Sequence, residues 1–320
     1  MSGQSPGPAD APGPDLRNEV TQLDPTHLEP PEPGPVSATR SGRRGLGSRL
    51  WSVLRGTPSG WVAVVMLALL MGAAALAPVL PLDPTTPDVG NMSAGPSAEH
   101  WLGTDEIGRD YLARVIDGGR ISLLVGLAAM AASLLIGVTL GLTAGFLGGW
   151  VDVALMRLVD FLSSIPWIVL VIVASVFLRP GLLTIILIIG GLTWMPIARL
   201  VRAETLSAKE RTYVVYADFI GLGRPTIVAR HVVPAVIGTI IIAATGTISS
   251  AMMTEAALSF LGLGIQQPMS SWGSLLQTAQ SGMQRAPLLA IVPGLLIMAS
   301  VYSFNVLGNL VRRATTLEDL

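Results

Sequence analysis

The chain has 320 residues, of which 51% are hydrophobic and only 13% are charged. Its mean hydropathy of +0.61 excludes an ordinary soluble domain, and its net charge of −1 gives no reason to expect nucleic-acid binding. Cysteine is absent and the three histidines are far apart in sequence, which excludes disulfides and predicts no metal site built on cysteine or clustered histidine.

The chain begins with a proline-rich segment. Nine prolines fall between Pro6 and Pro35, with few large apolar residues among them, so this segment cannot build a core. We predict a disordered cytoplasmic tail over residues 1–48. Ala75-Leu76-Ala77 resembles a signal-peptidase site, but the polar segment before it is too long for a signal peptide and the apolar run is a full span. We therefore expect an uncleaved anchor.

Six runs of about 20 apolar residues are long enough to cross a bilayer as helices. Lipid offers no hydrogen bonds to the backbone, so runs this apolar favour helices, and we predict an all-α membrane protein with six transmembrane helices. Pro166 and Pro196 lie inside two of the runs, where we expect kinks. The runs are Trp61–Leu80, Ser122–Phe146, Val153–Leu178, Leu182–Val201, Val232–Leu258 and Leu288–Val311.

The distribution of basic residues predicts the orientation of these spans, because cytoplasmic loops of membrane proteins are enriched in arginine and lysine. If the arginines before the first span are cytoplasmic, 15 of the 20 basic residues lie inside and five lie outside. Both termini are then cytoplasmic. The five outside are Arg109, Arg114, Arg120, Arg179 and Arg285.

Charged residues within the predicted spans matter, because an unpaired charge is costly there. Arg157 and Asp160 stand three apart near the inner end of the third span, and we expect them to form an ion pair on one helix face. Glu255, near the outer end of the fifth span, is either a solvated boundary residue or part of a polar path. In the second span, Gly137 and the glycines four and eight residues later share a face that allows close helix packing.

The segment His100–Asp110 follows the first span and contains turn-forming glycine and aspartate. We interpret it as an external loop. His100 with three nearby carboxylates is only weak support for a metal site there.

A charged island from Arg199 to Pro234 separates the fourth and fifth spans. It contains six of the 20 basic residues and reads as a polar loop, which the positive-inside rule places in the cytoplasm. Such a loop is a natural site for a soluble partner to bind the membrane domain.

The only lysine of the chain is Lys209 in Ser-Ala-Lys-Glu, so no phosphate-binding P-loop exists and any ATP hydrolysis belongs to another subunit. Gly-x-Ser-x-Gly and His-Glu-x-x-His motifs are absent as well.

Several stretches together resemble the membrane subunits of dipeptide/oligopeptide ABC importers, specifically the second of the paired permeases. The resemblance covers about residues 50–315 and leaves out the proline-rich tail. The stretches are Leu102–Asp105, Gly108–Asp110, Arg120–Gly126, Gly148–Asp152, Met156–Asp160, Arg199–Arg202, Leu206–Arg211, Glu255–Gly264 and Ser271–Gly273.

The resemblance implies the type I ABC importer permease fold, and an importer made of two homologous permeases, two ABC ATPase subunits and an extracytoplasmic solute-binding protein. ATP and Mg would bind the ATPases, and this chain would bind no cofactor. In this family the cytoplasmic loop holds a Glu-Ala-Ala-x3-Gly motif in a short coupling helix that docks in a groove of the ATPase. The residues that the resemblance assigns to this helix are Tyr213, Val214, Val215, Tyr216, Ala217, Asp218, Phe219, Gly221, Leu222 and Gly223.

The chain departs from that motif at two positions. Gly221 and Ala217 match the motif glycine and second alanine, whereas Val215 replaces the glutamate and Tyr216 the first alanine. The departure puts the polarity of the ATPase contact in doubt but leaves the helix length and the glycine intact. If the helix docks, Gly221 is needed either for close backbone approach or for a positive φ.

These features predict a permease subunit, without enzymatic activity of its own, in the plasma (inner) membrane of a prokaryote. Peptides are the expected substrate, with nickel or oligosaccharides as alternatives, because fold-level analogy does not choose among them. A membrane-embedded enzyme would need a catalytic set of residues, which the predicted spans lack. A membrane sensor or receptor would need a folded signalling domain, which the sequence does not predict. The expected organisation is the tail at 1–48, the first helix and external loop at 49–118, the permease domain at 119–312, and a short cytoplasmic tail at 313–320.

Overall fold

The computed structural model describes residues 46–179 and 181–316. Within these ranges every regular element is a helix, apart from one isolated bridge between Thr104 and Asp110. Five helical segments are long and apolar enough to cross a membrane, and a bent helix pair makes six if it is counted as one span. The prediction of an all-α chain with six spans is therefore confirmed. The proline-rich segment before residue 46 and the last four residues lie outside the described ranges.

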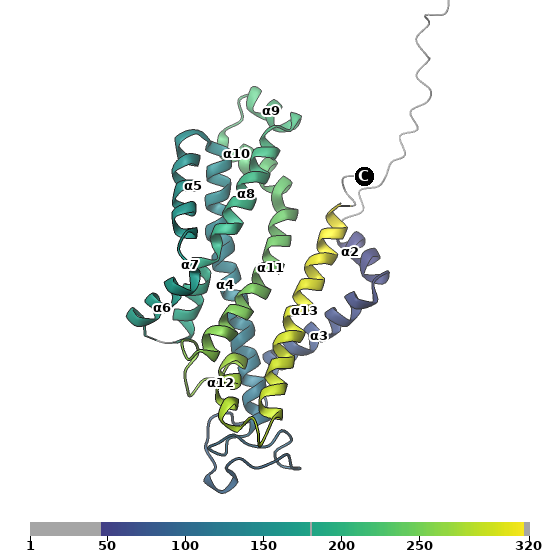
Figure 1. Cartoon of the computed structure of the whole chain (residues 1–320). Coiled ribbons are helices and arrows are strands. Elements are labelled where there is room, and N and C mark those ends of the chain that lie inside the picture. Colours follow the sequence, from purple (N-terminus) through teal and green to yellow (C-terminus); the bar gives the residue numbers. More distant parts are fainter. Residues whose placement is uncertain (1–45, 180, 317–320) are drawn as a thin grey trace, which may run out of the picture. The chain divides into compact units, whose positions relative to one another are not determined.

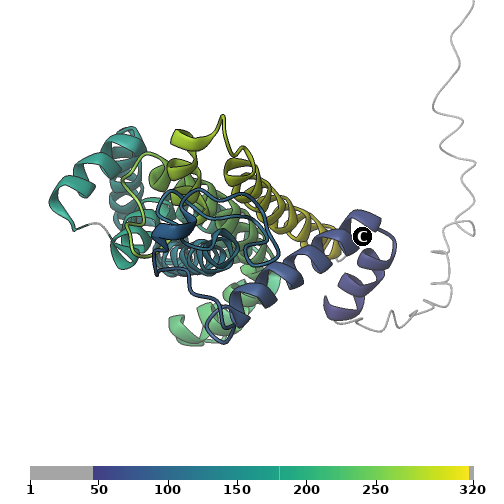
Figure 2. The ribbon, with the colours of Figure 1, turned by 90° about the horizontal axis from the view of Figure 1, so that it is seen from below.

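The first two helices contact each other before the connection to α4 (Tyr111–Leu147) begins. The short helix α2 (Leu46–Arg55) is joined edge to face to α3 (Pro58–Leu76) through the rings of Trp51 and Trp61, whose centroids are 5.7 Å apart. Leu69 on α3 is 69% exposed, as expected for a helix that faces lipid. Seen from below, α3 runs along the edge of the bundle beside α13 (Leu288–Thr316) (Figure 2).

Helix α4 (Tyr111–Leu147) is the central element of the bundle. It begins 11 residues before the predicted start of this span, because the side chain of Asp110 accepts a hydrogen bond from the Ala113 amide and caps the helix. The predicted glycine face packs against α8 (Trp194–Lys209): a Cβ on Gly137 would lie 2.7 Å from the Ile197 side chain. Gly141 and Gly145 meet the same helix equally closely, so the predicted close packing is confirmed.

Both predicted proline kinks are breaks between helices. Helices α5 (Gly149–Ser163) and α6 (Trp167–Phe177) are bent by 80° at Pro166, which cannot donate a backbone hydrogen bond. Helix α7 (Leu182–Leu192) ends at Thr193, and Pro196 lies in the first turn of α8, where its missing N–H is least costly. The segment from α7 to α8 still qualifies as one span.

The charged island is mostly helical. The short helix expected from the resemblance is present as α9 (Thr212–Phe219), whereas the continuation of α8 into the island was not expected and replaces part of the predicted polar loop. Helix α8 continues to Lys209, and α9, α10 (Arg224–Ile227) and the π-helical turn η4 (Val228–Val232) lead into α11 (Val233–Phe260). Alanine, arginine, lysine and glutamate are good helix formers, which explains why polar composition did not end α8. Helices α9 and α10 lie at one end of the bundle (Figure 1).

The opposite end carries the connection between α3 and α4, which includes the turn η3 (Val89–Asn91), and the short helix α12 (Trp272–Gly282) (Figure 1). Helix α12 is too short to cross a membrane and was not predicted. It starts with a capping box between Ser271 and Ser274, and the Trp272 indole donates to the Val115 carbonyl of α4 at 3.0 Å. This hydrogen bond seats α12 on the start of α4.

Candidate functional site

Helix α9 has one buried face and one exposed face. Val214 and Ala217 are 4% and 3% exposed and belong to a core cluster with Ile227, Val232 and Val236 from the following helices. Because the buried side chains are small, α9 lies close to the body of the protein. This attachment fixes the direction in which the opposite face points.

The opposite face of α9 consists of large apolar side chains. Phe219 is 86% exposed, Tyr216 63% and Val215 55%. Contiguous apolar patches on a surface mark interaction sites, and aromatic side chains are the usual anchors of such contacts. The patch lies on a segment between two spans, amid the basic residues of the island, and not on a membrane-crossing helix.

The C-terminus of α9 closes in a Schellman motif. The amide of Leu222 donates to the Ala217 carbonyl at 3.1 Å, and the amide of Gly221 donates to the Asp218 carbonyl at 3.0 Å. Gly221 has φ +77°, and nothing lies within 4 Å of the position a Cβ would take. The positive φ is therefore the reason for glycine here, and crowding within this chain is not. Gly223 follows with ordinary extended backbone, φ −61°, and precedes α10.

Ionic contacts brace the helix that leads into α9. Arg202 of α8 makes a two-pronged contact with Asp152 of α5, with Nη2 2.6 Å from Oδ2. Lys209, the last residue of α8, donates to the Phe146 carbonyl at the end of α4 at 2.8 Å. A cation at a helix C-terminus is favourable because carbonyls there lack partners. These contacts connect α8, the helix that precedes α9, to α4 and α5.

The predicted pair between Arg157 and Asp160 does not form. Asp160 instead accepts from Arg199 of α8 at 3.1 Å, and Arg199 also donates to Ser163. Arg157 is exposed, and no ion pair of it occurs in the described ranges. The i,i+3 spacing on α5 permitted a local pair, but the carboxylate of Asp160 is bound by the guanidinium of Arg199 on the neighbouring helix.

Glu255 on α11 is fully buried, so the solvated-boundary alternative is wrong. Its carboxylate accepts from the Ser122 hydroxyl of α4 at 3.0 Å and from the Ser259 hydroxyl at 2.7 Å. Each hydroxyl in turn accepts from a backbone amide, of Trp272 and of Ile265 respectively, both at 3.1 Å. Glu255 therefore joins α4, α11 and the start of α12, and its contacts are structural.

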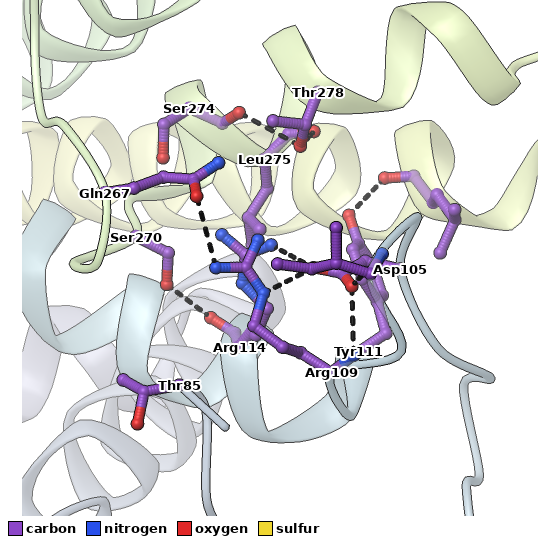
Figure 3. A network of polar contacts seen from close by, with 12 residues as sticks. Thr85, Asp105, Arg109, Tyr111, Arg114, Gln267, Ser270, Ser274, Leu275 and Thr278 are labelled. Carbon is purple, nitrogen blue, oxygen red and sulfur yellow. Dashed lines mark hydrogen bonds and ion pairs between the residues drawn. The ribbon is translucent and has the colours of Figure 1, made fainter. Parts of the chain in front are cut away.

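A second polar cluster lies where the connection between α3 and α4 meets α4 and α12 (Figure 3). The carboxylate of Asp105 accepts from Arg109 Nε at 2.7 Å, and Arg114 Nη1 contacts the same oxygen. Arg109 also reaches Gln267 at 3.4 Å. All three charged residues are less than 9% exposed, so one carboxylate is shared by two arginines away from bulk water.

The electrostatics of Asp105 favour its charged form. Burial alone would raise the pKa of Asp105, but hydrogen bonds and charge from Arg109, together with the charge of Arg114, outweigh burial and hold the pKa below its usual value. His100 contacts Asp110 at 2.8 Å, and Asp110 is occupied in capping α4. No group of three or more metal-binding side chains occurs among the described residues.

The structure separates the sequence-predicted residues into different roles. Of the residues predicted for the coupling helix, Val215, Tyr216 and Phe219 share the exposed face of α9, whereas Val214 and Ala217 are buried on its inner face and are not available to a partner. Asp160 and Glu255 belong to separate contacts. The buried Asp105–Arg114 pair and the serine partners of Glu255 were missed, because the residues in contact are far apart in sequence or hidden in a loop motif. The charge density of Thr104–Asp110 beside a helix start was the one available signal for the former.

Residues 137–316, more than half of the chain, match the family of the binding-protein-dependent transport system inner membrane component. The glutathione transport system permease protein GsiD of Pectobacterium atrosepticum is 40% identical over 227 residues, covering 71% of this chain and 75% of that protein. The oligopeptide transport system permease protein OppC of Escherichia coli K12 is 38% identical over 267 residues, which cover 83% of this chain and 88% of that protein.

Among solved structures, an inward-facing form of the MetNI methionine ABC transporter is similar in fold. The TM-score is 0.54 at 19% identity, and the alignment covers 64% of this chain and 96% of the other. At this identity the likeness concerns the fold alone. The prediction of an ABC importer permease fold is confirmed.

Proposed function

This chain belongs to the family of binding-protein-dependent transport system inner membrane components, and from this premise we propose that it carries di- or oligopeptides through the membrane as one permease of an ATP-driven importer. The partners in this proposal are a second permease, two ATPase subunits and an external binding protein. The peptide substrate is supported by relatives whose names describe glutathione and oligopeptide transport. ATP hydrolysis belongs to the partners.

The observation that carries the proposal is the exposed face of α9. A short helix with aromatic side chains outward, and small side chains packed inward, is suited to dock in a groove of a soluble subunit. Full burial of a phenylalanine such as Phe219 contributes about 1.5–3 kcal/mol. Val215, which stands where relatives of the resembled family carry glutamate, extends this apolar face and favours an apolar groove in the partner.

Mechanical coupling follows from the attachments of α9. Lys209 ties the helix before α9 to α4, and Arg202 ties it to α5. A force on α9 is thus passed to the helices of the bundle as a unit. We assign alternating access to this arrangement: ATP binding in the partners moves α9 and tilts the attached spans.

The proposed orientation places α9 in the cytoplasm and the α3–α4 connection outside. The absence of cysteine allows a direct test with single substitutions. Thr212 and Val89 are both exposed. Thr212 begins α9 and Val89 lies in the connection between α3 and α4, and these two elements are at opposite ends of the bundle (Figure 1). An impermeant thiol reagent should label Val89→Cys in intact cells and Thr212→Cys only in inverted vesicles. Labelling of Thr212→Cys in intact cells would reject the orientation.

Function is tested by reconstitution. Vesicles that contain this chain, the second permease and the ATPases should take up a labelled tripeptide only when ATP and the binding protein are supplied. Uptake of nickel or of an oligosaccharide, with no uptake of peptide, would reject the substrate while retaining the importer.

A further inference from the structure

A cavity of about 540 Å³ lies between the external connection and the segment that joins α12 to α13. Its walls include apolar side chains such as Leu102 and Pro287, and its charged residues come from both sides. A concave site of this size, mostly apolar with a few converging polar groups, has the character of a small-ligand pocket.

Two buried arginines line this cavity. Arg109 and Arg114 are 4% and 2% exposed, and both contact the single carboxylate of Asp105 (Figure 3). Two guanidinium groups thus share one negative charge, which leaves local positive charge away from bulk water. Among residues 46–179 and 181–316, Arg114 Nε is the one buried side-chain nitrogen or oxygen without a hydrogen-bond partner. A buried donor without a partner is costly, so Arg114 favours an additional acceptor, which can reach Nε only once the protein atoms that cover it move aside.

Other charged groups lie on the same cavity. Arg285 lines it and is exposed, as is Glu106, whose carboxylate accepts from the Ser281 hydroxyl. The cavity therefore offers three arginines and two carboxylates, one of which is already shared by two arginines. A short peptide with free ends has matching chemistry, because it carries one carboxylate and one ammonium group.

We propose that this cavity binds a short peptide by its free carboxylate, with Arg114 and Arg109 as the receiving groups and Glu106 near the peptide ammonium. Arginine suits this role because its planar donors match a carboxylate. The inference rests on the proposed function, which supplies the peptide. Docking of the binding protein fits the site less well, because protein interfaces spread over about 800 Å² per partner and this site is a ligand-sized cavity.

The test measures binding of trialanine to the assembled importer in nanodiscs, without the binding protein. The free acid should bind and the C-terminal amide should bind at least tenfold more weakly, since it lacks the charge. Ala286 lines the cavity, so Ala286→Trp should fill it and abolish binding. Arg285→Glu should weaken binding of the acid severalfold. Arg179→Glu makes the same change at an exposed arginine outside the cavity and should leave binding unchanged.

Three results would overturn the proposal: equal affinity for acid and amide, unchanged binding in Ala286→Trp, or no binding of the acid. If trialanine fails to bind but Arg285→Glu and Ala286→Trp weaken the binding protein's affinity, the cavity receives that protein and the peptide assignment is wrong. Uptake by the wild-type importer is measured in parallel. If peptide is taken up but the free acid and the amide bind equally well, only the assignment of the cavity is rejected. If the free acid binds more tightly than the amide but no peptide is taken up, the proposed function is rejected and the binding site is retained.

Discussion

At the end of the bundle that carries α9, large apolar side chains face outward, whereas at the end that carries α12, Asp105, Arg109 and Arg114 are buried together. Phe219 is 86% exposed, while Arg114 and Asp105 are 2% and 7% exposed. In our proposal, a partner covers the apolar face of α9. The buried charges of the α12 end contact one another beside a cavity. One end of the bundle thus leaves apolar side chains for a partner, and the other pairs charges within the chain.

The largest expected effect comes from placing a charge on the outward face of α9. Phe219→Asp should abolish uptake, because a carboxylate would have to leave water to enter an apolar groove of the ATPase. The subunit should still insert and fold, since Phe219 makes little contact within the chain. Uptake and pull-down of the ATPases from detergent extract are the measurements. Val89→Asp makes the same change at a 79% exposed residue of the opposite end and should have little effect.

Gly221 tests whether the shape of α9, and not only its apolar face, is required. Gly221→Val should abolish uptake with the subunit still inserted, because φ is +77° and a left-handed conformation costs an L-residue roughly 1–2 kcal/mol. Gly221→Asn should retain much of the activity, since asparagine tolerates this conformation. Loss of uptake in both variants would point to crowding by the partner in place of φ. Normal uptake in Gly221→Val combined with Phe219→Asp would remove α9 as the mechanical link.

The end of the bundle that carries α12 is tested by Asp105→Asn, which leaves two buried arginines without their shared carboxylate. Breaking a buried pair costs about 3–5 kcal/mol, so thermal unfolding of the purified subunit should shift clearly downward. Glu99→Gln, an exposed change on the same connection, should leave the unfolding temperature nearly unchanged.

The difference in stability between wild type and Asp105→Asn should depend on pH with a definite sign. Because the folded-state pKa of Asp105 is lowered, its stabilisation is fully present above the ordinary aspartate pKa of about 3.9. It is lost as the pH falls through the lower folded-state pKa. The stability difference between wild type and Asp105→Asn should stay constant from neutral to mildly acidic pH. It should shrink only when the pH falls below the ordinary aspartate pKa. A gap that grows on acidification would contradict the assigned charge state.

The smallest effect is expected at the exposed pair between Arg199 and Asp160, whose side chains are 46% and 63% exposed. A double-mutant cycle should give about 0–1 kcal/mol. The two-pronged pair of Arg202 and Asp152, with 32% and 15% exposure, should give a larger coupling that falls less with salt. Equal couplings would mean that burial does not distinguish the two contacts.

The sequence predicted the spans well because the bilayer requires a length and an apolar composition that can be counted directly. Helix ends were harder to predict. Helix α4 starts early because Asp110 caps it, and α8 continues into the charged island because its polar residues still favour helix. The break at Pro166 followed from proline chemistry, but its 80° angle depends on packing.

The candidate site was predictable where neighbouring residues in sequence make it up. Helix α9 is one short segment, so its residues could be assigned from a motif. Glu255 could not be assigned, because its partner Ser122 is on another helix. The i,i+3 rule favoured Arg157 for Asp160, but it takes no account of Arg199 on the adjacent helix. Contacts across helices require the fold.

The central claim is that the outward face of α9 docks an ATPase subunit. The cysteine-free chain allows Tyr216→Cys, at a residue 63% exposed, to be probed with a maleimide in inverted vesicles. We expect rapid labelling when the permeases are present without ATPases, and strong protection once the ATPases are bound. Val89→Cys, probed from the opposite side, should label equally in both cases. Equal labelling of Tyr216→Cys with and without the ATPases would contradict the account.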